Sequence, residues 1–245
     1  MYRIAALACV FFIGISSLKA QHQITSPDEK IKVNISAENG ISYSVSLNDE
    51  VFIAKADIDL IFNKTSLGKN TKFTRPVLSK QKTTIKPVVA LKQSSIENSY
   101  NQLTLAGKEF TVEFRVFNDG LAYRFVTERK GEVEVNEKAN FEFAGNFSMW
   151  ASPIEAYVGS YEVNYEKVKI ANFRTKNTYL PVLFKNGGSH KMLLTEADIF
   201  DYPHMFLKKG DGNSLEATFP PFPIETELIN DRASKVTKGA DYIAK

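Results

Sequence analysis

The chain has 245 residues, of which 43% are hydrophobic, 12% aromatic and 24% charged, with a formal net charge of +3 and one cysteine. These fractions are those of an ordinary folded protein, and they exclude wholesale disorder, a collagen-like sequence and a disulfide scaffold. So small a net charge also lacks the electrostatic footprint of a nucleic-acid-binding protein, so no nucleic-acid partner is expected.

Residues 1–20 have the layout of a secretory signal. Arg3 precedes an uncharged apolar run from Ile4 to Ile15, and a short polar stretch then leads to Ala20. The run of about 12 residues is too short for a membrane span, which needs about 20. We therefore expect cleavage after Ala20, no membrane span, and a periplasmic or secreted location. A buried N-terminal strand is the alternative interpretation.

Cleavage at this point changes the chemistry of the chain. The only cysteine, Cys9, leaves with the signal, so the mature protein has no disulfide and no thiol chemistry. Arg3 and Lys19 leave as well, and the remaining 29 basic residues against 28 acidic ones give a net charge of about +1. A chain without cysteine must be stabilised by its core, and this one is long enough to bury one.

Alternation of apolar and polar residues with a period of two dominates the rest of the chain. The runs 31–35 and 41–47 flank Glu38-Asn39-Gly40, and the runs 110–116 and 121–125 flank Asn118-Asp119-Gly120. Because Gly and Asn tolerate positive φ angles at little cost, both triplets predict β-hairpins. Shorter strands are expected at 133–135, 141–143, 179–184, 192–195 and 215–219. Many short strands separated by turns indicate an all-β fold with antiparallel sheets.

Helical periodicity is weak throughout. The best helical candidate, 199–207, is interrupted by Pro203, which cannot donate a backbone hydrogen bond. The Lys-rich stretch 64–92 is interpreted as a solvated connection or an edge strand, because lysines protect an exposed edge against further pairing.

Common catalytic and metal-binding motifs are missing. His22, His190 and His204 do not have the spacing of a zinc site. Neither Ser160 nor Ser189 sits in a Gly-x-Ser-x-Gly elbow, and there is no Gly-rich phosphate loop. Hydrolase and nucleotide chemistry of these kinds is therefore not expected.

Three acids follow the predicted strand that ends near residue 195. Glu196, Asp198 and Asp201 fall within six positions of one another. Strand ends of this kind can supply hard oxygen ligands for Ca²⁺, which takes 6–8 of them. Three acids are too few for a complete site, and a strand end followed by a capped turn is the alternative interpretation.

An aromatic stretch lies near the middle of the chain. Trp150, the only tryptophan, is followed by Tyr157, Tyr161 and Tyr165 around Glu162. Aromatic faces beside polar groups can stack on sugar rings and bond their hydroxyls. Trp150, Tyr161 and Glu162 are therefore candidates for substrate binding, with core packing as the alternative.

An ordered set of segments resembles the N-terminal region of glycoside hydrolase family 97 enzymes. The set comprises the opening 24–33, the segment 41–45, the hairpin 114–125, Tyr161-Glu162 with Tyr165, Thr195-Glu196-Ala197-Asp198, and the segment 201–205. The resemblance covers residues 24–245, and the order and spacing that these segments share with the family make the set specific.

This resemblance implies a fold and a cofactor. Members of the family are secreted α-glucosidases or α-galactosidases, with an antiparallel β-super-sandwich like that of galactose mutarotase, then a catalytic (β/α)₈ barrel and a small β domain. Their site uses Ca²⁺, and the N-terminal domain contributes one Glu to it. By its place in the Thr-Glu-Ala motif, that residue is Glu196 here. The catalytic carboxylates belong to the barrel, so no catalytic residue is expected in this chain.

The resemblance divides the chain into three parts. We expect a signal peptide at 1–20, the β-super-sandwich at 21–235, and at 236–245 the start of a connection to a barrel that this chain lacks. This domain would come from a truncated or split gene, or would be a fragment of a longer protein. It would pack on the barrel, line one side of the substrate pocket and donate Glu196. Without the barrel's ligands, Ca²⁺ binding would be weak or absent and hydrolysis absent. Glucoside or galactoside specificity, and retention or inversion, stay open because the barrel's carboxylates set them.

Two other functions remain open. A stand-alone carbohydrate-binding module would have a polar surface on all sides. A docking domain separated from its partner domain would expose an apolar face. The apolar, proline-rich segment 219–224 points to the docking domain. An enzyme like an aldose epimerase would use His and Glu as acid and base, but His190 and His204 show no matching context.

Overall fold

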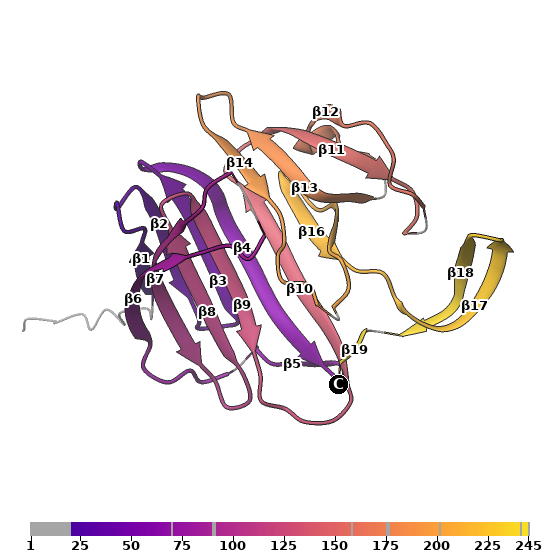
Figure 1. Cartoon of the computed structure of the whole chain (residues 1–245), viewed down its shortest axis with the longest axis horizontal. Helices are drawn as coiled ribbons and strands as arrows, with labels where there is room; N and C mark the ends of the chain where they lie inside the picture. The colour runs from indigo at the N-terminus through magenta and orange to yellow at the C-terminus, as the bar shows by residue number, and fades with distance from the viewer. Residues whose placement is uncertain are drawn as a thin grey trace, which may run out of the picture.

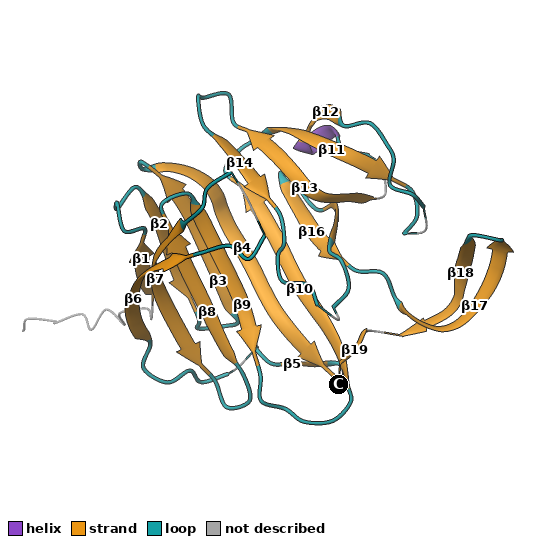
Figure 2. Ribbon diagram, viewed as in Figure 1, coloured by secondary structure: helices purple, strands orange, loops and turns teal. Residues whose placement is uncertain are grey.

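A computed structural model describes residues 21–69, 71–89, 92–157, 159–174, 177–200, 202–240 and 242–244 (Figure 1). Residues 242–244 are described by their backbone alone. The predicted signal at 1–20 lies outside these residues, so its cleavage and the resulting location stay predictions. In the described ranges every regular element is a β-strand except one short 3₁₀ helix, η1 (Ile170–Asn172) (Figure 2). None of the described residues forms a helix long and apolar enough to cross a membrane.

The larger sheet has 13 strands, all paired antiparallel. Its order is β1 (Gln21–Thr25), β2 (Ile31–Ser36), β3 (Ile41–Leu47), β4 (Glu50–Phe62), β10 (Val133–Phe143), β16 (Ser214–Thr218), β15 (Phe206–Lys209), β13 (Asn177–Lys185), β11 (Ser148–Ile154) and β12 (Glu166–Lys169). Three short strands lie beside this path: β5 (Thr65–Ser66) on β4, β14 (Lys191–Leu194) on β13, and β19 (Tyr242–Ala244) on β10.

A second sheet of four strands packs over the start of the first. Its order is β6 (Val77–Ile85), β7 (Ile96–Ala106), β8 (Thr111–Phe117) and β9 (Gly120–Val126), and Figure 1 shows it layered on β1, β2 and β3. Tyr43 of β3 meets Phe114 of β8 and Tyr123 of β9, with ring centroids 5.6 and 6.0 Å apart. The expected all-β, antiparallel super-sandwich is confirmed.

The core lies between the sheets and continues along the inner face of the larger one. Alternate residues of each strand point inward, so Val33 and Ile35 of β2 and Val112 and Phe114 of β8 are fully buried. Farther along, Phe143 of β10 stacks on Phe184 of β13 with centroids 4.5 Å apart. One continuous apolar cluster therefore joins both ends of the molecule.

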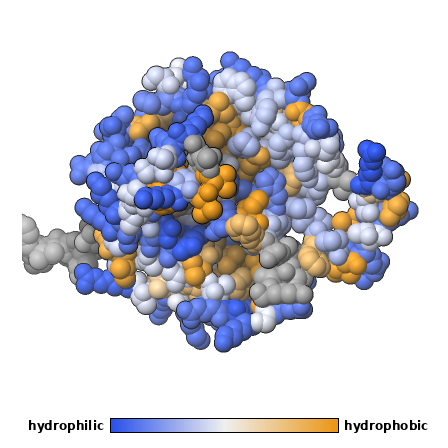
Figure 3. Space-filling view, in the orientation of Figure 1, coloured by the Kyte–Doolittle hydropathy of each residue, from blue (hydrophilic) through white to orange (hydrophobic). Residues whose placement is uncertain are grey.

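Two strands near the C-terminal end form a separate hairpin. Among the described strands, β17 (Phe222–Asn230) pairs only with β18 (Ala233–Ala240), and the pair projects from the body of the molecule (Figure 1). Ile224, Leu228 and Ile229 are exposed on it, and the hairpin carries both hydrophobic and hydrophilic residues on its surface (Figure 3). The predicted boundary after residue 235 falls inside β18, and the division of the chain stays a prediction.

The two expected hairpins form, but one of them for a different backbone reason. Gly40 has a φ of 105°, as its turn signal predicts. Gly120 and its two predecessors have no positive φ, so the expectation of a left-handed backbone there is wrong. Asn118 instead uses its side chain, whose Oδ1 accepts a hydrogen bond of 3.0 Å from the backbone N–H of Asp28. This contact ties the β8–β9 turn to the β1–β2 turn.

Two other local predictions concern the segment 199–207 and the Lys-rich stretch 64–92. No helix forms in the described part of 199–207; the chain is irregular until β15 begins at Phe206, because Pro203 and the pairing of Phe206 with Tyr179 favour an extended backbone. The Lys-rich stretch contains β6, an edge strand exposed at all nine positions. Its lysines fit the interpretation as edge protection.

Replacing a ring at the sheet interface should cost stability. Phe114 is fully buried, so Phe114→Ala should lower the free energy of unfolding by about 3–5 kcal/mol, because it removes apolar contact and leaves a cavity. Urea denaturation measures this change. Val88→Ala, at a fully exposed position, should stay within about 0.5 kcal/mol of the native chain. Equal effects of the two substitutions would contradict the assigned interface.

Candidate functional site

Glu196 is held in place just after β14. The backbone N–H of Met205 donates to both of its carboxylate oxygens, at 3.1 and 3.0 Å. The Nδ1 atom of His204 pairs with Oε1 of the same carboxylate. All three residues lie on the segment that joins β14 to β15, so the turn of this segment brings them together. These contacts orient the carboxylate. The Glu196 side chain is 15% exposed, so the carboxylate stays partly accessible to solvent.

Opposing effects act on the pKa of Glu196. Burial raises the pKa, whereas the Met205 N–H and the His204 ring lower it, and the net direction is upward. A raised pKa means that the surroundings do not fully compensate the charged carboxylate. A cation placed beside Glu196 would supply that compensation.

A second acid, Glu137 of β10, lies in the same region. Its Oε1 accepts a hydrogen bond of 3.0 Å from the hydroxyl of Tyr123, and its Oε2 accepts one of 3.3 Å from the hydroxyl of Tyr202. Tyr123 belongs to the four-stranded sheet. Tyr202 lies on the β14–β15 segment, which also carries Glu196, His204 and Met205; these three residues are called here the Glu196 cradle. The carboxyl of Glu137 therefore connects both sheets with that segment.

The charges of the two acids influence each other. Burial is the main cause that raises the pKa of Glu137, and the negative charge of Glu196 raises it further, while the two tyrosine hydroxyls lower it. Burial and the charge of Glu137 in turn raise the pKa of Tyr43 and of Tyr123. These groups form one electrostatic unit that contains no cationic partner for Glu137 among the described residues.

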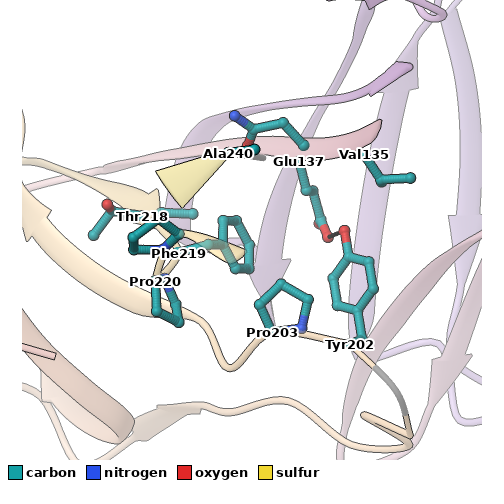
Figure 4. A pocket seen from close by; sticks show the side chains of 11 residues that line it. Val135, Glu137, Tyr202, Pro203, Thr218, Phe219, Pro220 and Ala240 are labelled. Carbon is teal, nitrogen blue, oxygen red and sulfur yellow. Dashed lines mark hydrogen bonds between the residues drawn. The ribbon is translucent and has the colours of Figure 1, made fainter. Parts of the chain in front are cut away.

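A pocket of about 240 Å³ opens beside Glu137 (Figure 4). Figure 4 shows the Glu137 carboxyl and the Tyr202 hydroxyl pointing toward each other on one side, with Phe219 and Pro220 on the other and Pro203 below. Tyr202 also meets the ring of Phe219 edge-on, with centroids 6.2 Å apart. Polar groups on one wall and flat apolar groups on the other can accommodate an amphipathic ring.

The aromatic candidate Tyr161 lies near this cradle. Its ring packs on Phe206, with centroids 5.8 Å apart, and the ring of His204 meets the same Phe206 at 5.5 Å. Tyr161 also packs on Tyr179 at 5.4 Å, and its backbone has a positive φ of 57°. The fold thus brings Tyr161 and Glu196 into one neighbourhood, with Phe206 and His204 between them.

Trp150 and Glu162 are not part of this cluster. Trp150 lies on β11, where the ammonium group of Lys167 sits 5.2 Å from its ring centroid. Glu162 is exposed, and its backbone N–H approaches the hydroxyl of Ser160 at 3.4 Å. Substrate binding by Trp150, Tyr161 and Glu162 stays a prediction.

Sequence reasoning missed Glu137, although a signal for it exists. On β10 the alternate positions Val133, Val135, Ala139 and Phe141 face inward, and Glu137 occupies the same alternation. A carboxyl on the apolar side of a strand must find hydrogen-bond donors or lose its charge. The alternation therefore marks Glu137 as unusual, but only the tertiary structure shows that Tyr123 and Tyr202 are its donors.

The described residues do not make a complete Ca²⁺ site. No three His, Cys, Asp or Glu side chains among them come close enough to hold a metal ion. Asp198 is exposed, with a φ of 59°, and Asp201 lies outside the described residues. Glu196 fits the role of a single ligand, because a carboxylate has about four lone-pair positions and its protein donors do not use all of them.

Comparison with known proteins identifies the family. The family model described as glycosyl-hydrolase 97 N-terminal matches residues 24–238. The chain belongs to this family. A "retaining alpha-galactosidase" of Bacteroides thetaiotaomicron is 29% identical over 247 residues, which cover 94% of this chain and 37% of that protein.

Solved structures show the same fold. A glycoside hydrolase family 97 enzyme in complex with acarbose, from Pseudoalteromonas sp. strain K8, matches with a TM-score of 0.73 and 20% identity over 91% of this chain and 34% of that one. A β-arabinopyranosidase matches with a TM-score of 0.73 and 25% identity over 81% of this chain and 35% of that one. The glycosyl-hydrolase 97 N-terminal chain described here thus spans about a third of the length of these relatives.

The raised pKa of Glu137 gives stability a defined pH dependence. The folded chain holds this proton above the ordinary pKa near 4.5, so its contribution is fully present below pH 4.5 and is lost as the pH rises through the folded pKa. Glu137→Gln removes this titration. The free energy of unfolding of the native chain minus that of Glu137→Gln should therefore fall as the pH rises from 4.5, in urea titrations at several pH values.

A matched control separates Glu137 from the other acids. Glu97→Gln, which changes an exposed carboxyl on β7, serves as the matched control and is measured at the same pH values. A Glu137→Gln difference that is flat, or that grows with rising pH, would show that burial of this carboxyl is misassigned.

Proposed function

We propose that this chain is a non-catalytic β-sandwich domain of a secreted, Ca²⁺-dependent α-glycosidase that acts on α-galactosides or α-glucosides. Its role is to pack on a catalytic barrel, to line one side of the sugar pocket and to donate Glu196 to a shared Ca²⁺ site. The family match and the homologous α-galactosidase support the enzyme class.

The oriented carboxylate of Glu196 is the observation that carries this proposal. Two hydrogen bonds from one backbone N–H and a pairing with His204 aim it, while burial raises its pKa. A nearby cation would stabilise the charged form of such a carboxylate, and Ca²⁺ prefers oxygen ligands of this kind. Because Ca²⁺ needs 6–8 oxygens, the other ligands must come from another domain or from water.

The Glu137 pocket supports the second part of the role. Its walls combine the Glu137 carboxyl with Phe219 and prolines, which suits the polar edge and the apolar face of a sugar ring. Glu196 acts electrostatically on Glu137, so this pocket and the proposed Ca²⁺ ligand belong to one region of the domain. We infer that this region faces the substrate.

The purified chain should bind Ca²⁺ only weakly. With one protein carboxylate, calorimetry should give a dissociation constant no tighter than about 10⁻³ M, the weak end of protein Ca²⁺ sites. Glu196→Gln should abolish this binding, and Glu97→Gln should leave it unchanged. In parallel, the chain should not hydrolyse p-nitrophenyl α-galactoside or p-nitrophenyl α-glucoside.

Either of two results would overturn this assignment. A submicromolar Ca²⁺ dissociation constant would mean that the chain holds a complete site of its own. Turnover that follows the pure chain through every purification step would mean that the chain carries catalytic groups itself.

A stand-alone carbohydrate-binding module is the second candidate, and the preformed pocket beside Glu137 favours it. If the chain acts in this way, titration with maltooligosaccharides or galactosides should release heat at millimolar sugar, and Tyr202→Phe should weaken binding because it removes a hydroxyl from the pocket wall. Absence of heat with both sugar classes would leave the domain role as the explanation of the pocket.

A further inference from the structure

A basic and apolar surface covers the outer face of four neighbouring strands, β12, β11, β13 and β14. In the register of the sheet, Trp150 lies opposite Lys167 on one side and Leu183 on the other, and Leu183 lies opposite Leu193. Directly opposite residues of antiparallel strands share a face. One row across the four strands therefore reads Lys167, Trp150, Leu183, Leu193.

A second row runs parallel to the first, two residues away along each strand. Ser148 lies opposite Lys169 and Lys185, and Lys185 lies opposite Lys191. Because side chains alternate along a strand, positions two residues apart point to the same side. The second row, Lys169, Ser148, Lys185 and Lys191, thus shares the outer face with the first.

Burial confirms that this face is the outer one. The residues between the two rows, Met149 and Phe184, are fully buried, and Met192 and Val168 are packed against the core. In the rows themselves Leu193 is 56% exposed, and Lys167, Lys169 and Lys191 are exposed. The two rows, called here the Trp150 face, take no part in the Glu137–Glu196 cluster.

The charge of the Trp150 face is uncompensated. Its four lysines form no ion pair within the described part of the chain, and neither row contains an acidic residue. The one acid within these four described strands, Glu166, lies opposite Ala151 and so belongs to the other alternation. Glu50 binds Asn186 and pairs with His190 at the tip of the β13–β14 hairpin. Four positive charges thus concentrate on one face of a nearly neutral domain.

We propose that the Trp150 face binds an anionic polysaccharide, one whose sugars carry carboxylate or sulfate groups. The row of Trp150, Leu183 and Leu193 offers a flat apolar strip across three strands, on which the apolar faces of sugar rings can lie. The lysine row beside it places ammonium groups where the acidic substituents of the same polysaccharide would lie, and lysine binds such groups as a point charge. Lys167, now over the indole ring, can move onto an acidic group and uncover the ring.

Charge decides against the other occupants of this face. A second copy of the chain would place lysines against lysines, which is destabilising for residues directly opposite each other. A neutral glucan would use the apolar strip but leave four positive charges without partners. The combination of strip and charge row favours a ligand with both a sugar face and regularly spaced anions.

Affinity electrophoresis tests this proposal with polygalacturonate as the probe and pullulan as the neutral comparison. The chain should be retarded by polygalacturonate at low salt, less at high salt because ion pairs are screened, and not by pullulan. Trp150→Ala and the double substitution Lys185→Ala/Lys191→Ala should each weaken the binding about tenfold. The matched control, Lys235→Ala/Lys238→Ala, removes two lysines of the projecting hairpin and should bind like the native chain.

Several outcomes would overturn the proposal. They are no retardation by polygalacturonate, equal retardation by pullulan, unchanged binding after Trp150→Ala, or equal loss in the hairpin control. Stronger binding to vesicles of anionic phospholipid than to polygalacturonate would assign the face to a membrane surface instead. Thermal unfolding of each variant, with Trp150→Phe as a milder second change, separates lost binding from lost folding.

Discussion

The packing of the four-stranded sheet on the first strands of the larger sheet is the interaction on which the rest of the structure depends. Tyr43, Phe114 and Tyr123 meet there as edge-on and tilted rings, an arrangement that adds to the apolar area they bury. The hydroxyl of Tyr123 emerges from this contact and reaches the carboxyl of Glu137. The contact that closes the core therefore also positions the candidate site.

From this point the electrostatics of the site follow from burial. A carboxyl set into an apolar interface is expensive to ionise, and two tyrosine hydroxyls compensate only part of that cost for Glu137. Glu196 lies in the same region with its carboxylate aimed by Met205 and His204. Two acids with raised pKa values, neither paired with a lysine or arginine among the described residues, make a region that a metal ion or a hydroxyl-rich ligand would stabilise. This is the physical argument behind the proposal that the domain faces substrate here.

The two faces of the larger sheet differ in composition. Its inner face carries the continuous apolar core, whereas its outer face at β11–β14 carries Trp150 and four lysines that form no ion pair with any described residue. The projecting hairpin adds exposed apolar residues at a third place.

Local patterns were enough to predict the strands and the antiparallel sandwich, because alternation with a period of two and turn residues are properties of short segments. The family came from the resemblance of an ordered set of segments, and that resemblance also singled out Glu196. Local patterns could not reveal Glu137: its place in the alternation of β10 is visible in the sequence, but its donors Tyr123 and Tyr202 lie on other elements. The left-handed backbone expected at Gly120 does not form either, and the Asn118 side chain of this turn accepts a hydrogen bond from Asp28, which is distant along the chain.

The candidate ligands show the same division. Sequence placed Trp150, Tyr161 and Glu162 together because they are near one another along the chain. The structure separates them, since Tyr161 packs on Phe206 beside the Glu196 cradle while Trp150 faces outward from β11. By itself the sequence determined the fold class, the family and which residues carry polar or aromatic groups. Only the tertiary structure decided which of those groups meet, because burial, pKa and charge compensation arise between residues that are distant in the chain.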